Sequence, residues 1–269
     1  MKKIAKASLF SRKGANLSMR CSYKVRWAFS LISISLGSIG FELSAQVPTS
    51  ARQLIVSIAP DWDSRRAILQ CFERSEPNEP WHPAFRHSWD VLLGAKGLAW
   101  GRGVFTPTNS KVPNKIEHDG RAPAGVFELG RLYGYAANPP AGSTWPYVQV
   151  GPSDAWIDDP RLPHYNQFVH LDPNNLPPWF ESQKMRLGDS AYKWLLEIRH
   201  NCNPATPGYG SAIFFHVRRG PDTPTAGCTT MAVENLEMMA HWLKMERFPY
   251  YVLLPRSEYE KNRERWRLP

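Results

Sequence analysis

A histidine and a cysteine near the end of the chain offer its clearest chemistry. His216 ends the apolar run Ile213-Phe214-Phe215, and Cys228 follows twelve residues later, directly after Gly227. The segment between them is rich in glycine and proline, which favours a loop that brings thiol and imidazole together. An imidazole that lowers the pKa of a thiol and holds its proton makes a nucleophile for acyl transfer. The pair therefore predicts a cysteine acyltransferase, with a buried structural thiol beside an unrelated histidine as the alternative.

The residues around Cys228 fit the same chemistry. Because Gly227 has no side chain, a substrate carbonyl can approach the backbone, and the amides of Gly227 and Cys228 are predicted to form an oxyanion hole. A helix is predicted over Ala232 to Lys244, where apolar residues from Leu236 to Leu243 recur at i, i+3, i+4 and i+7. The positive N-terminal end of this helix is expected to favour a thiolate.

The elements that must position these residues are short strands separated by turns. Gln53–Ala59 and Ala67–Arg74 are predicted to form a hairpin. Further strand candidates are Ser88–Leu93, Leu98–Arg102, Gly125–Leu129, Lys193–His200, Ser211–Val217 and Tyr250–Leu254. Prolines crowd the stretch from Leu132 to Pro178, which indicates long loops over one side of the sheet. We expect a mainly β fold, a curved β-sandwich or partly open barrel, with one short helix after the cysteine.

The first 45 residues have the pattern of a secretory signal peptide. Basic residues lead into an apolar run from Trp27 to Phe41, and small residues precede the end of the segment at Ala45. Met19 is an alternative start to Met1, and a retained N-terminal anchor is the competing interpretation. We expect cleavage after Ala45 and a location in the periplasm or cell envelope.

Removing this segment changes the charge of the chain. The formal net charge is +9, but residues 1–45 hold eight Lys or Arg and one Glu, so 25 basic and 23 acidic residues remain, a net charge of +2. This balance removes the main support for nucleic-acid binding. We expect a catalytic domain over residues 46–258 and a solvated basic tail over 259–269. The mature protein is expected to be a monomer with no nucleic-acid partner and no membrane anchor.

Three cysteines follow the predicted signal segment, namely Cys71, Cys202 and Cys228. An odd count in an exported protein indicates one disulfide and one spare thiol, so a Cys71–Cys202 disulfide is predicted, with two buried reduced thiols as the open alternative. His200, at the end of a predicted strand, is interpreted as structural. The sequence has no Cys-x-x-Cys, His-Glu-x-x-His, glycine-rich phosphate loop or Gly-x-Ser-x-Gly, so no metal site and no cofactor are expected.

Several segments, taken in chain order, resemble the L,D-transpeptidases of bacterial cell walls, the YkuD-like family. Members carry a histidine at a strand end and then a Ser/Thr-x-Gly-Cys loop, as do His216 and Thr225-Ala226-Gly227-Cys228 here. The stretch Asp119-Gly120-Arg121-Ala122-Pro123-Ala124-Gly125-Val126-Phe127 is similar to the family's Asp-Gly-x-x-Pro-x-Gly-x-Phe. Asp158-Asp159-Pro160 with Tyr165-Asn166 also resembles a family element. The similar segments span about residues 53–254.

This resemblance implies a peptidoglycan enzyme and agrees with the predicted fold. Cys228 would attack the L,D amide of a tetrapeptide stem and form a thioester, and His216 would move the proton. An amine from a neighbouring stem would then resolve the thioester. With water as the acceptor, the same site would make a peptidoglycan hydrolase or amidase. A non-catalytic wall-binding module is the alternative from another class.

The resemblance also implies residues that contact the substrate. Those at family positions are Thr225, Tyr165 and Asn166. The chain departs from many members at Ala226 and Thr230, which stand where they have a histidine and an arginine. We therefore expect Arg218 or Arg219 to supply the cation for a stem-peptide carboxylate, because a guanidinium binds carboxylate bidentately.

Overall fold

Strands β1 (Gln53–Ala59) and β2 (Arg66–Glu73) pair antiparallel and form the hairpin predicted from the sequence. The structure, a computed structural model, describes residues 47–104 and 111–269. β1 is buried along almost its whole length, whereas β2 alternates between exposed and buried side chains, as a strand with one face on the core does. The predicted signal peptide and its cleavage point after Ala45 lie outside the described residues.

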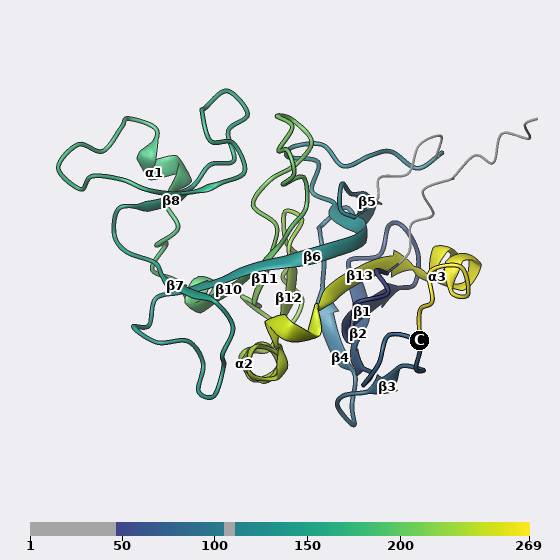
Figure 1. Ribbon diagram of the computed structural model, residues 1–269. Helices are drawn as coiled ribbons and strands as arrows, with labels where there is room; N and C mark the ends of the chain where they lie inside the picture. Colours follow the sequence, from purple (N-terminus) through teal and green to yellow (C-terminus); the bar gives the residue numbers. More distant parts are fainter. Residues whose placement is uncertain (1–46, 105–110) are drawn as a thin grey trace, which may run out of the picture. The chain divides into compact units, whose positions relative to one another are not determined.

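Eight strands of the described residues close into a barrel (Figure 1). Around it lie, in order, β1, β13 (Tyr250–Pro255), β6 (Ala122–Gly134), β10 (Trp194–Ile198), β11 (Phe214–Val217), β12 (Thr229–Met231), β4 (Trp89–Leu92) and β2. β1 with β13 and β11 with β12 are parallel, and the other neighbours are antiparallel. The mainly β prediction is confirmed, and the sheet is closed because β1 pairs with both β13 and β2.

Shorter strands extend this sheet at its margins. They are β3 (His82–Pro83) on β2, and β5 (Leu98–Trp100) and β7 (Tyr147–Gln149) on β6. β6 is much longer than predicted, because Ala122 to Ala124 and Leu132 to Gly134 also find pairing partners elsewhere in the chain.

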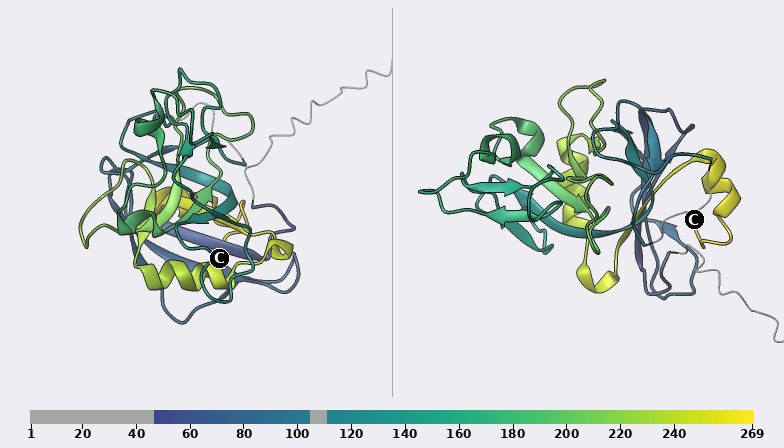
Figure 2. Two further views of the ribbon diagram at one scale, coloured as in Figure 1. Left: turned by 90° about the vertical axis from the view of Figure 1, so that its left-hand side faces the viewer. Right: turned by 90° about the horizontal axis from the view of Figure 1, so that it is seen from above.

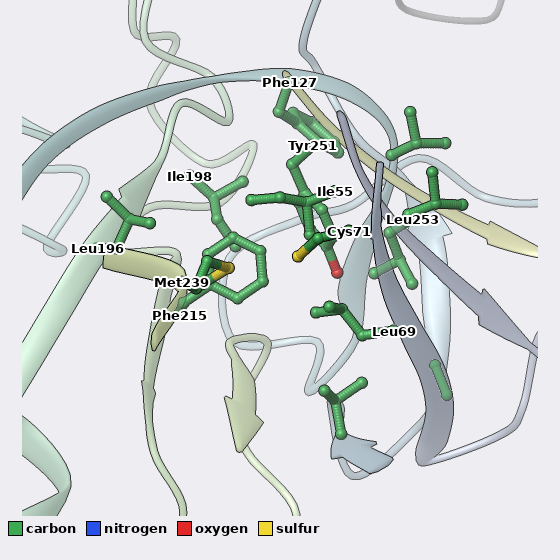
Figure 3. Packing of buried hydrophobic residues seen from close by; sticks show 14 of the residues in the cluster. Ile55, Leu69, Cys71, Phe127, Leu196, Ile198, Phe215, Met239, Tyr251 and Leu253 are labelled. Atoms are coloured by element: carbon green, nitrogen blue, oxygen red, sulfur yellow. The ribbon is translucent and has the colours of Figure 1, made fainter. Parts of the chain in front are cut away.

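Successive residues of β10 and β11 point to opposite faces of the sheet. Leu196 and Phe215 belong to the main core inside the barrel, where Figure 3 shows Phe215 next to Met239. Leu195 and Phe214 belong to a second apolar cluster on the other side of the same strands. We call this side, formed by β6, β10, β11 and β12, the outer face. The alternation of side chains along these strands thus separates a structural core inside the barrel from an outer face that can carry a functional site.

One helix follows the cysteine loop, as predicted. Helix α2 (Val233–Trp242) packs Leu236 and Met239 into the main core. Further short helices are α1 (Phe180–Gln183), α3 (Arg256–Asn262), and the 3-10 turns η1 (Ser190–Lys193) and η2 (Met245–Arg247). In the described parts of the chain, no helix has the length and apolar character needed to cross a membrane.

The C-terminal residues are not simply a solvated tail, and the prediction is wrong in this respect. The side chains of Trp266 and Leu268 are buried and join the main core. Removing two large apolar side chains from water stabilises this end of the chain by about 1.5–3 kcal/mol for each side chain. The basic residues Lys261, Arg263, Arg265 and Arg267 remain exposed.

Residues 150–190, which we call the cap, lie over the outer face. The cap contains a separate two-stranded sheet of β8 (Asp154–Trp156) and β9 (Phe168–His170), with α1 next to β8 (Figures 1 and 2). Trp156 and Phe168 pack on Tyr133 of β6, with ring centroids 5.8 and 5.3 Å apart. The loops predicted here are therefore anchored by aromatic contacts to the barrel.

The cysteines of the described residues are free, so the predicted Cys71–Cys202 disulfide is wrong. Cys71 lies on β2 and points into the main core, whereas the thiol of Cys202 donates a hydrogen bond to the carbonyl oxygen of His200, with Sγ and O 3.2 Å apart. The interpretation of His200 as structural is confirmed. Its Nδ1 accepts from the Arg102 backbone, and its Nε2 donates to the carbonyl oxygen of Tyr209.

Candidate active site

Cys228 and His216 lie on the same outer face of two adjacent parallel strands. In the register of β11 and β12, Phe215 is opposite Thr229 and His216 is opposite Thr230. Because alternate residues share a face, Cys228 points to the same side as Thr230 and therefore to the same side as His216. The structure thus places the two residues that the sequence predicted as nucleophile and base on one face of adjacent strands.

The resting thiol of Cys228 is hydrogen-bonded to the backbone of the neighbouring segment. The N–H of Phe214 donates to Sγ, and the thiol donates to the carbonyl oxygen of Ala212, both over 3.4 Å. Burial raises the pKa of the thiol to about 11, although the Phe214 N–H and the charges of Lys115 and Arg219 act in the opposite direction. The lowered thiol pKa expected from the sequence is wrong for this state of the protein.

The N-terminal end of the helix after Cys228 was expected to lie next to the thiol, but it does not. β12 separates Cys228 from Val233, the first residue of α2. The field of a helix terminus falls off within about one turn, so the thiol gains little from it.

His216 is buried and has one defined tautomer. Its Nδ1 lies 2.9 Å from the carbonyl oxygen of Val217, and a carbonyl only accepts, so Nδ1 carries the proton. Nε2 is therefore left with a free lone pair, as a general base requires. Burial lowers the pKa of the imidazole to about 4, so it is neutral at pH 7. The ring of Tyr192 from η1 packs edge-on against it, with centroids 5.8 Å apart.

The loop before Cys228 is braced by Thr225. Its Oγ1 accepts from the N–H of Gly227 over 3.0 Å and donates to the carbonyl oxygen of Cys228 over 2.7 Å. A methyl group on Gly227, which has a φ of +158°, would lie 2.9 Å from the carbonyl oxygen of Arg121. The Gly227 amide is thus already bonded within the loop and does not face a substrate, which corrects the predicted oxyanion role of this amide. Thr225 supports the loop rather than offering its hydroxyl to a ligand.

The two arginines after His216 go to different places. The Arg218 guanidinium donates to the backbone carbonyl of Asp90, away from the thiol. Arg219 is exposed and pairs with Asp189 over 2.9 Å, and its guanidinium lies 5.6 Å from the ring centre of Tyr192. Since Tyr192 also contacts His216, Arg219 is the one of the pair that lies near the site.

Tyr165 and Asn166, expected to contact substrate, are buried supports of the cap. The Tyr165 hydroxyl donates to the carboxylate of Glu117. The Asn166 amide donates to the carbonyl oxygens of His200 and Asn201 over 2.9 Å, and its Oδ1 accepts from the N–H of Ala212 over 3.0 Å. These hydrogen bonds give both side chains a supporting role within the protein, and Asn166 also lines the cavity described below, so direct substrate contact stays a prediction.

Sequence reasoning missed three groups that meet the thiol or the imidazole. The Ala212 carbonyl and the Phe214 amide contact Sγ, and the ring of Tyr192 contacts His216. Ala212 has a left-handed φ of 53°, which an alanine rarely adopts and which the sequence does not signal. The strained turn is what points its carbonyl oxygen at the thiol.

A cavity of about 780 Å³ opens on the outer face beside the cap. Its walls include Tyr133, Trp156 and the carboxylate of Glu197, which lies opposite Phe214 in the β10–β11 register. Trp156 and Phe214 pack with ring centroids 4.8 Å apart, so the cavity wall touches β11, the strand that carries His216 and whose Phe214 N–H donates to the thiol. The cavity has the volume of a small-molecule site. Among the described residues, no group of three or more His, Cys, Asp or Glu could hold a metal ion.

A closed β-barrel that presents a thiol and a neutral imidazole on one face is a fold equipped for thiol chemistry. The family model of the L,D-transpeptidase catalytic domain, YkuD, matches residues 85–252, more than half of the chain. The protein therefore belongs to the L,D-transpeptidase family. Searches of curated proteins and of solved structures gave no match.

Proposed function

We propose that this protein is an exported cysteine acyltransferase that cross-links or remodels peptidoglycan. Membership of the L,D-transpeptidase family supports a peptidoglycan enzyme. The observation that carries the finer proposal is the position of Cys228 and His216 on one face of adjacent strands, with Nε2 of the imidazole free to accept a proton. No cofactor is needed for this chemistry.

The proposed reaction has two acyl transfers. Nε2 of His216 takes the proton of the Cys228 thiol, and Sγ attacks the L,D amide carbonyl of a stem tetrapeptide. The C–N bond breaks, the terminal D-alanine leaves with the proton from His216, and a thioester remains. His216 then takes a proton from an acceptor amine, which attacks the thioester and forms a new amide as the C–S bond breaks, and the proton on His216 returns to Sγ to restore the thiol. The Phe214 N–H stabilises the sulfur while it carries negative charge.

The test is incubation of the purified protein with tetrapeptide muropeptides, followed by mass analysis. We expect dimers that form with loss of D-alanine. Cys228→Ala should abolish turnover, and His216→Ala should lower it about 10²–10⁴-fold, which is what general-base assistance contributes. Loss of D-alanine without dimers would assign water as the acceptor and make the protein a hydrolase. Full turnover by Cys228→Ala would refute the thiol mechanism, whereas no conversion of muropeptides by the original protein would favour a wall-binding module.

We also propose that the chain acts in the periplasm or cell envelope as a monomer. The support for this location is the basic and apolar pattern of residues 1–45, with small residues before Gln46, whereas the monomeric state stays a prediction. N-terminal sequencing of protein from the envelope fraction should give Gln46, and a chain that still begins at Met1 or Met19 would contradict cleavage.

A further inference from the structure

A buried lysine lies next to the cysteine loop, and the sequence motifs did not single it out. The Lys115 side chain is only 3% exposed, although it ends in an ammonium group. The group donates to Asp119 Oδ1 over 2.7 Å and to the carbonyl oxygen of Ile116 over 3.4 Å. Its backbone N–H bonds to the carbonyl oxygen of Trp100 of β5, which ties the lysine to the barrel.

The partner of Lys115 is itself held in place. Asp119 accepts from the backbone N–H groups of Ile116 and Arg121 over 3.0 and 2.9 Å. These bonds close the loop of residues 115–121 around the carboxylate, and therefore fix the position of the ammonium. A buried ion pair seldom adds stability over an apolar pair of the same size, so a lysine kept here calls for another use.

The ammonium lies directly behind the backbone that carries the nucleophile. A methyl group on Gly227 would be 3.4 Å from Lys115 Nζ, and Gly227 immediately precedes Cys228. The charge of Lys115 lowers the pKa of the Cys228 thiol, against the larger effect of burial. Because the ammonium of Lys115 lies behind the loop, a substrate that binds in front of the thiol would not push it aside.

The other groups around the thiol do not duplicate this charge. Arg219 also lowers the thiol pKa, but it is exposed and paired with Asp189. On the same side Tyr192 and His216 are neutral at pH 7, because burial raises the pKa of the phenol and lowers that of the imidazole. A nearby acidic group is the carboxylate of Glu117, which accepts a hydrogen bond from the hydroxyl of Ser211, the residue before Ala212.

We propose that Lys115 is a positioning residue of the thiol site, whose ammonium is fixed by Asp119 behind Gly227 and offsets the cost of the negative charge on Cys228 Sγ. The proposal rests on the proposed function for the reaction that this charge serves. The field itself acts on the thiol whether or not a muropeptide is turned over.

The test is the rate at which iodoacetamide alkylates Cys228 between pH 7 and pH 10, mapped by peptide mass so that Cys71 and Cys202 are read separately. Lys115→Met should lower the rate about tenfold at each pH, since one pKa unit changes the thiolate fraction tenfold below the pKa. Lys115→Arg keeps the charge and should restore the rate to within about threefold of that of the original protein. Lys111→Met, which removes an exposed lysine at the other end of the same segment, should leave the rate unchanged.

Lys115→Met leaves Asp119 unpaired and could fail to fold, so the double variant Lys115→Met/Asp119→Asn removes both charges together. Circular dichroism identifies the folded variants. Alkylation at the original rate by either folded variant at every pH would overturn the proposal. If alkylation depends on Lys115 but muropeptides are not converted, the proposed function fails and the role of Lys115 stands.

Discussion

The proposed nucleophile, Cys228, and the proposed base, His216, are both neutral in the free protein. Burial raises the pKa of Cys228 to about 11 and lowers that of His216 to about 4, so neither carries charge at pH 7. The thiol donates to the Ala212 carbonyl in this state. In the proposed reaction, transfer of its proton to Nε2 of His216 would therefore accompany substrate binding, when the Phe214 N–H and nearby positive charges compensate for the forming thiolate.

Arg219 provides the prediction at the scale of a single residue. Its guanidinium is exposed beside Tyr192, and Tyr192 packs on His216, so a stem-peptide carboxylate can reach it without crossing the core. Arg219→Ala should raise the KM for the donor muropeptide roughly tenfold, which corresponds to one charge-assisted hydrogen bond. Arg218→Ala is the matched control and should leave KM unchanged, because Arg218 bonds to the Asp90 carbonyl. An unchanged KM in Arg219→Ala would contradict the prediction that Arg219 binds the carboxylate of the donor.

At the scale of elements, the sequence predicted those strands and helices whose position follows from a local pattern of apolar residues. The β1–β2 hairpin and α2 follow from alternation and from helical spacing, and both are confirmed. The loops of the cap were predicted, but the contacts that anchor them could not be, because they join residues far apart in the chain, such as Asn166 to His200. The errors at Thr225 and Gly227 have a local cause, because the hydrogen bond between these two residues occupies groups that the motif alone leaves free.

Asn166 is the residue through which the cap is joined to the thiol site. Its side chain bonds to the backbone at His200, Asn201 and Ala212, and the Ala212 carbonyl contacts Cys228. Asn166→Ala should lower the free energy of unfolding by about 2–4 kcal/mol, because several buried polar groups lose their partners. Urea unfolding would measure this change.

The neighbouring residue offers a matched control for that prediction. Gln167 is exposed and one position along the same segment, so Gln167→Ala should change the free energy of unfolding by less than about 0.5 kcal/mol. Equal stability of the Asn166→Ala and Gln167→Ala proteins would show that the cap is not held by this amide.

At the scale of the whole molecule, the barrel is larger than the segment that matches the family model. The match covers residues 85–252, whereas β1 and β2 precede it and Trp266 and Leu268 follow it. β1 and β2 close the barrel, and the C-terminal residues fill the main core. A protein cut to the matched segment would lack two strands of the closed sheet.

Two buried neutral histidines make the stability of the molecule depend on pH. Burial lowers the pKa of His200 to about 3 and that of His216 to about 4, from an ordinary value of 6.5. Between about pH 6.5 and pH 4 the unfolded chain therefore binds two protons that the folded protein does not. The two histidines thus favour folding above pH 6.5, and their contribution is lost as the pH falls. Each should add about 1.4 kcal/mol per pH unit to the slope.

Urea unfolding between pH 7 and pH 4.5 would measure this slope, and a substitution would isolate the share of one histidine. His200→Gln lowers stability at pH 7 because His200 holds two backbone hydrogen bonds, but it should also make the slope shallower by about 1.4 kcal/mol per pH unit. The slope separates titration from a loss of packing, which would lower stability equally at every pH. His87→Gln, at an exposed histidine, should leave the slope unchanged. A His200→Gln protein with the original slope would contradict the prediction, because it would mean that His200 is protonated in the folded barrel. The structure requires a neutral ring instead, since Nδ1 of His200 accepts a hydrogen bond from the Arg102 N–H.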